Sequence, residues 1–167
     1  KNCYANGKVK GSASGGLVAS FATINGTSSN IIISNCRSDV SVNGVCAGGI
    51  TAFFAAGQIE NCIFTGSLYS PDDCIGGIVA SVSPHDSKTS YDYLLNNVKI
   101  INCVSTENIC NSAEKTEENG TVMKPYISNC YYSGEYDSAV ENYSDGDITL
   151  RKTSKVDGKS FKDASFY

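Results

Sequence analysis

Residues 35–52 read NCRSDVSVNGVCAGGITA, and this stretch decides the fold because its parts recur along the chain. The dipeptide Asn-Cys occurs five times, at Asn2-Cys3, Asn35-Cys36, Asn61-Cys62, Asn102-Cys103 and Asn129-Cys130. In the first three repeats it is followed by Gly-Gly and an apolar residue, at 15–17, 48–50 and 76–78. The cysteines of successive pairs are 33, 26, 41 and 27 residues apart. A period of about 26 residues, stretched by insertions, is typical of a solenoid.

The segments between these markers have the composition of strands. Short apolar and β-branched pieces are bounded by Gly, Asn and Ser, and no run has the periodicity of a helix. Two or three short strands per repeat suit a parallel β-helix. We therefore expect an all-β fold, a right-handed parallel β-helix (β-solenoid) of about five rungs, in which each repeat forms one rung.

Stacking explains why the same residue types recur. Neighbouring rungs of such a fold lie about 4.8 Å apart, so each repeat position sits above its counterpart. Cysteine is small and suits an inward position. Asparagine tolerates the left-handed backbone of a corner, and stacked amides can bond to one another. Gly-Gly allows a second corner that a side chain would block. We therefore assign structural roles to these positions.

The later repeats are less regular than the first three. The fourth keeps Asn102-Cys103 but lacks Gly-Gly, and its counterpart is expected in Gly120-Thr121-Val122-Met123. The fifth opens at Asn129-Cys130 and becomes polar after Gly134. We therefore divide the chain into β-helix repeats over residues 1–134 and a C-terminal cap or linker over 135–167. A cap is favoured by five apolar anchors, Val140, Ile148, Leu150, Phe161 and Phe166.

The N-terminus lies inside a rung, without the apolar lead-in of the other repeats. We therefore expect a monomeric fragment of a larger chain, with its targeting sequence elsewhere.

The eight cysteines raise the question of disulfides. Five share one repeat position, and Cys46 and Cys74 share another, two residues before Gly-Gly. Stacked, parallel side chains have Cβ atoms nearly 5 Å apart, whereas a disulfide requires about 3.8 Å. We therefore expect reduced, buried thiols rather than bridges. The chain has no Cys-x-x-Cys motif and one histidine, His85, so no metal site or cofactor is predicted.

Composition limits the classes of partner. The 167 residues include 13 basic and 17 acidic side chains, for a net charge of −4, and the basic residues are scattered. This pattern argues against nucleic-acid binding. No apolar run is long enough for a bilayer, so we expect no direct membrane insertion.

The apolar tetrapeptides resemble the GLUG-motif repeats of bacterial secreted and surface proteins. They are Gly16-Leu17-Val18-Ala19, Gly49-Ile50-Thr51-Ala52 and Gly77-Ile78-Val79-Ala80, each ending in Ala where the motif has Gly. Repeats of this family accompany adhesins and surface peptidases that cleave immunoglobulin A. The resemblance implies a non-catalytic module of a bacterial secreted or cell-surface protein, serving adhesion or structural presentation. It implies no catalytic residues.

Ligand contact is expected where the repeats are interrupted, because insertions at one corner project from one edge. The larger insertion spans residues 83–97, and we predict that it contacts a host glycan or a host surface protein. Its candidate ligand-binding residues are His85, Asp86, Tyr91, Asp92 and Tyr93. The alternative is a loop whose tyrosines fold back over the edge of the rung.

An enzyme is the rival class, because many parallel β-helices cleave acidic polysaccharides. Asp72-Asp73 resembles the paired aspartates of polygalacturonases, which act as acid and base at a glycosidic bond. The upstream Asn-Thr-Asp, the Gly-His-Gly and the Arg-Ile-Lys of that family are missing. The pair also aligns with the residues that precede Gly-Gly in the second rung, which favours a turn at Pro71. We therefore expect no catalysis in this chain.

Overall fold

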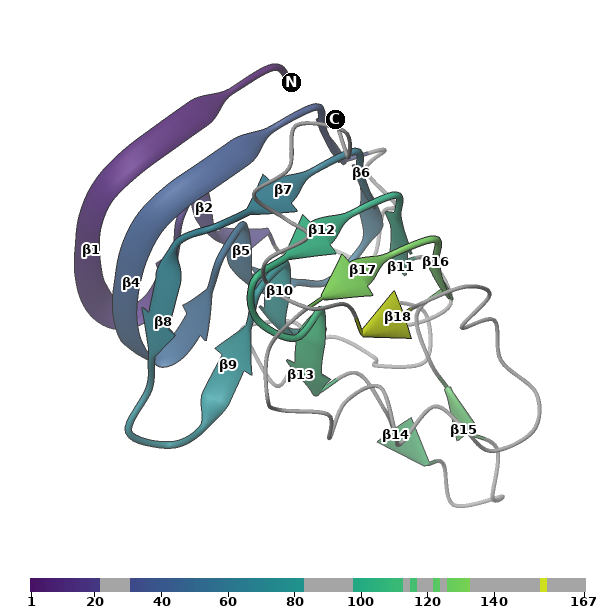
Figure 1. Ribbon diagram of the computed structural model, residues 1–167. Helices are drawn as coiled ribbons and strands as arrows, with labels where there is room; N and C mark the ends of the chain where they lie inside the picture. Colours follow the sequence, from purple (N-terminus) through teal and green to yellow (C-terminus); the bar gives the residue numbers. More distant parts are fainter. Residues whose placement is uncertain are drawn as a thin grey trace.

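The computed structural model describes residues 1–21, 31–82, 98–112, 115–116, 122–123, 126–132 and 154–155. Every regular element in these ranges is a β-strand, and none of the described residues is helical. Figure 1 shows the long strands β1 (Tyr4–Gly15) and β4 (Arg37–Gly48) curving side by side around one end of the molecule. The expected all-β fold is confirmed for the described residues.

Most strands belong to three parallel sheets. The largest has the order β1, β4, β7 (Ile63–Phe64), β12 (Val104–Ser105), β17 (Tyr131–Tyr132) and β18 (Ser154–Lys155), and β8 (Ser67–Tyr69) and β9 (Cys74–Gly76) also pair with β4. The second has the order β13 (Cys110–Ser112), β10 (Val79–Ser81), β5 (Thr51–Phe54) and β2 (Val18–Phe21). The third has the order β16 (Tyr126–Ser128), β11 (Val98–Ile101), β6 (Gly57–Glu60) and β3 (Ile32–Ser34). An antiparallel pair, β14 (Lys115–Thr116) with β15 (Val122–Met123), stands apart from them.

The pairing register follows the sequence repeat. In the largest sheet, the residue after each Asn-Cys pair stands beside its counterpart, in the order Tyr4, Arg37, Ile63, Val104 and Tyr131. In the third sheet, Ile33, Ile59, Ile100 and Ile127 pair in the same way. Successive repeats therefore stack in parallel and in register, as the spacing of Asn-Cys predicts, and "rung" below means one stacked repeat.

Both predicted corners have the backbone features that the sequence requires. The five asparagines of the Asn-Cys pairs have φ between 52° and 56°, in the left-handed region. At the other corner, a Cβ on Gly48 would overlap the carbonyl oxygen of Thr51, and one on Gly49 would overlap that of Gly77. These glycines are therefore required by close backbone packing, whereas the asparagines are required by backbone conformation.

The core lies between the sheets and is built from stacked side chains. Ile59, Ile100, Phe54 and Phe64 are fully buried, and the cysteines at positions 36, 62, 103 and 130 are buried among them. Each large apolar side chain buried in this way contributes about 1.5–3 kcal/mol. The same residue types that mark the repeat in the sequence therefore hold the rungs together.

The fourth rung differs from the prediction. Gly77 N donates to Asn108 O at 2.8 Å, and Ile78 N donates to Ile109 O at 3.0 Å. Asn108-Ile109-Cys110 therefore occupies the place that Gly-Gly and the following strand hold in earlier rungs. The assignment of Gly120-Thr121-Val122-Met123 to this place is wrong, since Val122–Met123 pairs with Lys115–Thr116 instead.

The fourth rung is shorter because it omits the excursion that the third makes through β8 and β9. In the third rung 11 residues lie between Phe64 and Gly76 (76 − 64 − 1), whereas two lie between Ser105 and Asn108 (108 − 105 − 1). Asn108 is 1 % exposed; its Nδ2 donates to Ile75 O at 3.1 Å, and its Oδ1 accepts from Gly77 N at 3.3 Å. Both polar ends of this buried amide are thus paired.

Candidate functional site

The predicted ligand-binding residues lie outside the part of the chain that the structure describes. His85, Asp86, Tyr91, Asp92 and Tyr93 all belong to residues 83–97, between β10 and β11. Their role as a contact surface stays a prediction. The candidate surfaces below are built from described residues.

Asp72 and Asp73, the pair considered for acid–base chemistry, lie in an exposed turn between β8 and β9. Asp73 has φ of 55°, and its carbonyl accepts from Ile75 N at 3.0 Å. Asp72 N donates to Ser70 Oγ at 3.2 Å, and Ser70 Oγ donates to Val45 O at 2.6 Å. Local turn geometry thus accounts for this segment, as its position before Gly-Gly indicates.

The corner asparagines form a continuous chain of side-chain hydrogen bonds. Nδ2 of each donates to Oδ1 of the one before it, at 3.3 Å for Asn35 to Asn2, 3.1 Å for Asn61 to Asn35, 3.2 Å for Asn102 to Asn61 and 2.6 Å for Asn129 to Asn102. The predicted Asn ladder is therefore present through all five Asn-Cys pairs. It ties the rungs together at one corner.

The cysteines next to these asparagines form a buried row beneath the corner. Cys103 Sγ donates to Ile101 O at 3.3 Å, and Cys62 Sγ donates to Glu60 O at 3.2 Å. Burial first, and then the neighbouring thiols, raise the pKa of Cys103 well above its usual value, which keeps this thiol protonated. Cys3, at the end of the row, is exposed. The thiols of this row are free, as predicted.

Cys46 and Cys74 depart from that expectation, because a disulfide joins them. They are register partners on β4 and β9, with a Cα–Cα distance of 4.7 Å, inside the range that bridged cysteines adopt. The expectation of reduced thiols rested on ideal stacking and is wrong for this pair. Both residues are half-buried. The strand β9 follows the turn at Asp73 and ends at the first glycine of Gly-Gly.

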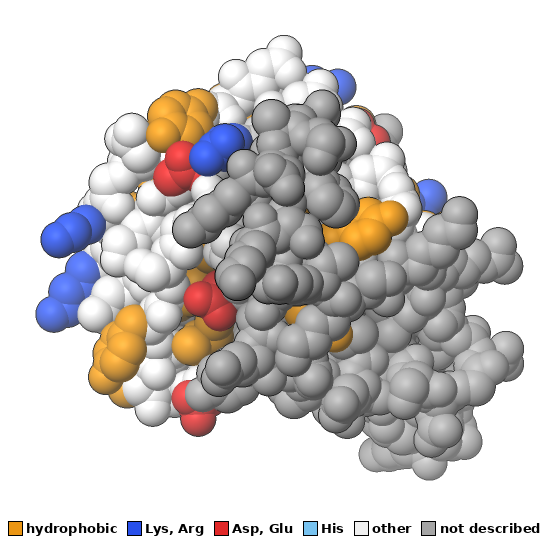
Figure 2. All heavy atoms as spheres, viewed as in Figure 1, with side chains coloured by type: hydrophobic (Ala, Val, Ile, Leu, Met, Phe, Trp, Pro, Cys, Tyr) orange, Lys and Arg blue, Asp and Glu red, His pale blue; other side chains and the backbone are white. Residues whose placement is uncertain are grey.

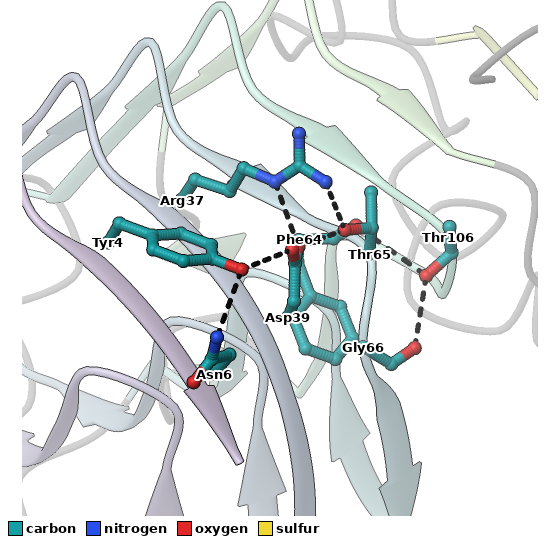
Figure 3. A network of polar contacts seen from close by, with 8 residues as sticks. All are labelled: Tyr4, Asn6, Arg37, Asp39, Phe64, Thr65, Gly66 and Thr106. Atoms are coloured by element: carbon teal, nitrogen blue, oxygen red, sulfur yellow. Dashed lines mark hydrogen bonds and ion pairs between the residues drawn. The ribbon is translucent and has the colours of Figure 1, made fainter.

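A cluster of polar side chains on the described surface crosses the first three rungs. Figure 3 shows Tyr4, Asn6, Arg37, Asp39 and Thr65 converging on the outer side of β1, β4 and the segment after β7. Tyr4 Oη donates to Asp39 Oδ2 at 3.0 Å, and Asn6 Nδ2 donates to Tyr4 Oη at 3.3 Å. Arg37 Nε lies 2.9 Å from Asp39 Oδ1, which also accepts from Thr65 Oγ1. We call these five residues the Asp39 network.

The carboxylate at the centre of this network is held in its charged form. Partial burial by itself would raise the pKa of Asp39, but hydrogen bonds from Arg37, Thr65 and Tyr4, together with the charge of Arg37, lower it overall. Both carboxylate oxygens accept hydrogen bonds. Such a group orients its neighbours and is a poor general acid, which requires a raised pKa. The network therefore fits binding better than proton transfer.

The sequence carries a signal for this cluster in the alignment of its repeats. Asn6, Asp39 and Thr65 each lie three residues after the cysteine of their rung, and Tyr4 and Arg37 lie one residue after it. Aligning the repeats on Asn-Cys therefore places the five side chains in two neighbouring columns. Their outward direction follows from the alternation of buried and exposed residues along β4.

Glu107 is a further acidic residue of interest, and it is one of the two residues between Ser105 and Asn108 in the fourth rung. Burial raises its pKa, and its backbone N donates to Ser105 Oγ at 3.0 Å.

Within the described ranges, no three His, Cys, Asp or Glu side chains come together in a way that would hold a metal ion. Among the same residues, no helix has the length and hydropathy needed to cross a bilayer.

Compared with protein-family models, curated proteins and solved structures, the chain has no significant match in any of the three sets.

Proposed function

We propose that this chain is a non-catalytic repeat module of a bacterial secreted or cell-surface protein, serving adhesion or structural presentation. In this proposal the stacked repeats form a right-handed parallel β-helix of about five rungs, closed by a C-terminal cap within residues 135–167. The resemblance of the apolar tetrapeptides to GLUG motifs supports the bacterial surface setting.

The observation that carries the proposal is the unbroken Asn ladder over all five Asn-Cys pairs. Together with the in-register sheets, it makes a scaffold whose layers are tied by both backbone and side-chain hydrogen bonds. A scaffold of this kind holds side chains of different rungs at fixed spacings, which suits the display of a contact surface.

Binding is favoured over catalysis by the state of Asp39 and of the Asp72-Asp73 pair. The Asp39 carboxylate is committed to hydrogen bonds and its pKa is lowered, so it does not supply a proton near neutral pH. Asp72 and Asp73 lie in an exposed turn rather than across a cleft. These observations support a module that recognises a partner without changing it.

The first experiment is a binding screen of the purified chain against a glycan array and immobilised mucin. Wild type is compared with the double variant Tyr91→Ala/Tyr93→Ala and with a variant in which residues 83–97 are replaced by a short Gly-Ser linker. We expect both variants to fold and to bind more weakly. As a matched control, Tyr126→Ala removes a tyrosine from β16, outside the insertion, and keeps wild-type binding.

The outcomes separate adhesion from presentation. Binding that is lost in the 83–97 variants supports adhesion through the insertion. Binding by none of the proteins contradicts adhesion and leaves structural presentation as the proposed role. Loss of solubility in the linker variant would show that residues 83–97 belong to the core instead.

A further inference from the structure

The outer face of β1, β4 and β8 continues from the Asp39 network along the strands, through further columns of aligned side chains. Along β4, exposed or half-buried residues alternate with buried ones from Arg37 to Gly44, so every second side chain points outward. The register then aligns three outward columns, which are Asn6-Asp39, Lys8-Ser41-Ser67 and Lys10-Asn43-Tyr69. The outer face consists of these three columns and of Tyr4 and Arg37, which precede them on β1 and β4.

Two tyrosines mark the ends of the outer face. Tyr4 and Tyr69 are each 60 % exposed, more than the other large apolar residues among those described. Tyr69 lies in the column of Lys10, six residues along the strand from Tyr4 and two rungs away. At about 3.3 Å per residue the two rings are separated by at most about 20 Å along the strand direction. Tyr4 is held in place by Asp39 and Asn6.

The surface between the two rings offers small polar groups and positive charge. Ser67 Oγ donates to Ser41 Oγ at 3.0 Å, and Asn43 adds an amide beside them. Lys8 and Lys10 are exposed, and the described part of the chain places no carboxylate within ion-pair distance of either. Figure 2 shows blue side chains projecting at the margin where Figure 1 places β1, with orange side chains above and below them.

We propose that this outer face binds an acidic oligosaccharide, with Tyr4 and Tyr69 as stacking platforms and Lys8 and Lys10 as partners for its anionic groups. The apolar C–H face of a sugar ring packs on an exposed aromatic ring, which supplies contact area at little entropic cost. The sugar hydroxyls exchange hydrogen bonds with Ser41, Ser67 and Asn43. Carboxylate or sulfate groups of the saccharide face the two lysines.

Alternative occupants fit this surface less well. A peptide added as a strand would use the edge of β1 that no described strand pairs with, whereas these side chains lie on the face of the sheet. A neutral glycan would leave Lys8 and Lys10 without a partner. Lysines also protect edge strands from aggregation, and that role requires neither exposed tyrosine. The inference rests on the proposed adhesive role and names its ligand class.

The test is a titration of the full chain with hyaluronan octasaccharide, followed by calorimetry, with neutral chitooligosaccharide as a comparison probe. Lys8→Gln/Lys10→Gln is expected to weaken hyaluronan binding about tenfold, and added salt should reduce this difference. Tyr69→Ala is expected to weaken binding about three- to tenfold. Lys99→Gln, which removes an exposed lysine from β11 in another sheet, is the matched control and retains full affinity.

Several results would overturn the inference. One is that poly-L-glutamate binds with the same affinity as hyaluronan and that Tyr69→Ala does not change this affinity. That result would indicate a simple charged patch. Another is unchanged hyaluronan affinity in the double lysine variant accompanied by self-association in sedimentation, since the lysines would then protect the edge. Hyaluronan binding that is lost only when residues 83–97 are replaced would place contact in the insertion; the proposed adhesive function would then stand while this inference fails.

Discussion

The side-chain amide of Asn61 donates to that of Asn35 at 3.1 Å, across 26 residues of sequence. It also accepts from Asn102 at 3.2 Å, across 41 residues. The same hydrogen bond forms across a regular repeat and across one with about 15 extra residues, because the extra residues fall in the sequence between one corner asparagine and the next. The corner asparagine therefore fixes where each rung begins, whatever the number of residues since the previous corner.

Two substitutions of Asn61 separate the contribution of its amide hydrogen bonds to stability from that of its left-handed backbone conformation. Asn61→Gly keeps the left-handed backbone and loses the amide bonds, for an expected cost of about 1 kcal/mol. Asn61→Ala adds the steric penalty of the left-handed conformation, about 1 kcal/mol more. Urea denaturation followed by circular dichroism measures both. Asn43→Ala, on β4 and outside the ladder, is the control and changes stability little; equal losses for Asn61→Gly and Asn61→Ala would contradict the role of backbone conformation.

Gly49→Ala tests the second corner. A Cβ at this position would overlap the carbonyl oxygen of Gly77 and the ring of Phe64, both in the buried interior. We expect a loss of at least about 2 kcal/mol, because overpacking of this kind displaces backbone. Gly11→Ala is the matched control, since its Cβ would meet the hydroxyl of Ser14 at 3.2 Å, and a small shift relieves that contact. Thermal melts that fall equally for both variants would contradict the steric argument.

The spacing of Asn-Cys was sufficient to predict the strands, the inward cysteines and the corner asparagines, because each is a local requirement repeated in register. It could not predict the shortened fourth rung, where Asn108 replaces Gly-Gly with its side chain bonded to Ile75 O. The two residues that lie between Ser105 and Asn108 carry no motif that would reveal this shortening in the sequence. The Asp39 network was missed for a different reason, since it joins residues from three rungs that have different side chains at equivalent positions.

Cys62 tests the buried thiol row. Its side chain is fully buried, so Cys62→Asp places a charge without a partner in the core, which costs several kcal/mol. We expect this variant not to fold, as judged by loss of the strand signal in circular dichroism. Cys3→Asp changes the same repeat position in the exposed first rung and should fold. A Cys62→Asp protein with the wild-type melting temperature would show that this position does not face the core.

The disulfide between Cys46 and Cys74 closes a loop with a sequence separation of 28 residues. By the loop-entropy relation, its reduction is expected to cost about 3–4 kcal/mol of stability. Cys46→Ala/Cys74→Ala should lose the same amount and no longer respond to reductant. Alanine fits this position, because Ala13 occupies it in the first rung. Alkylation of Cys46 and Cys74 in the unreduced chain after unfolding in urea, seen by mass spectrometry, would contradict the bridge.

Asp39 gives a prediction for acid stability. Partial burial opposes ionisation of Asp39, but the bonds from Arg37, Thr65 and Tyr4 outweigh it and lower the pKa below its ordinary value of 3.8. A carboxyl whose folded pKa is lowered contributes stability above its unfolded pKa, and this contribution disappears as pH falls through the folded pKa. The network should therefore weaken below about pH 4, the ordinary range of a free aspartate.

Asp39→Asn should be less stable than wild type at neutral pH, and the difference should shrink as pH falls below about 4. Urea titrations at several pH values measure it. Tyr4→Phe removes one bond to the carboxylate, so it should give a smaller difference with the same pH dependence. Tyr69→Phe, an equally exposed tyrosine outside the network, is the control and should follow wild type. If the gap between Asp39→Asn and wild type stays constant from pH 7 to pH 3, the Asp39 side chain acts through its shape alone, and the first three rungs are not joined by its charge.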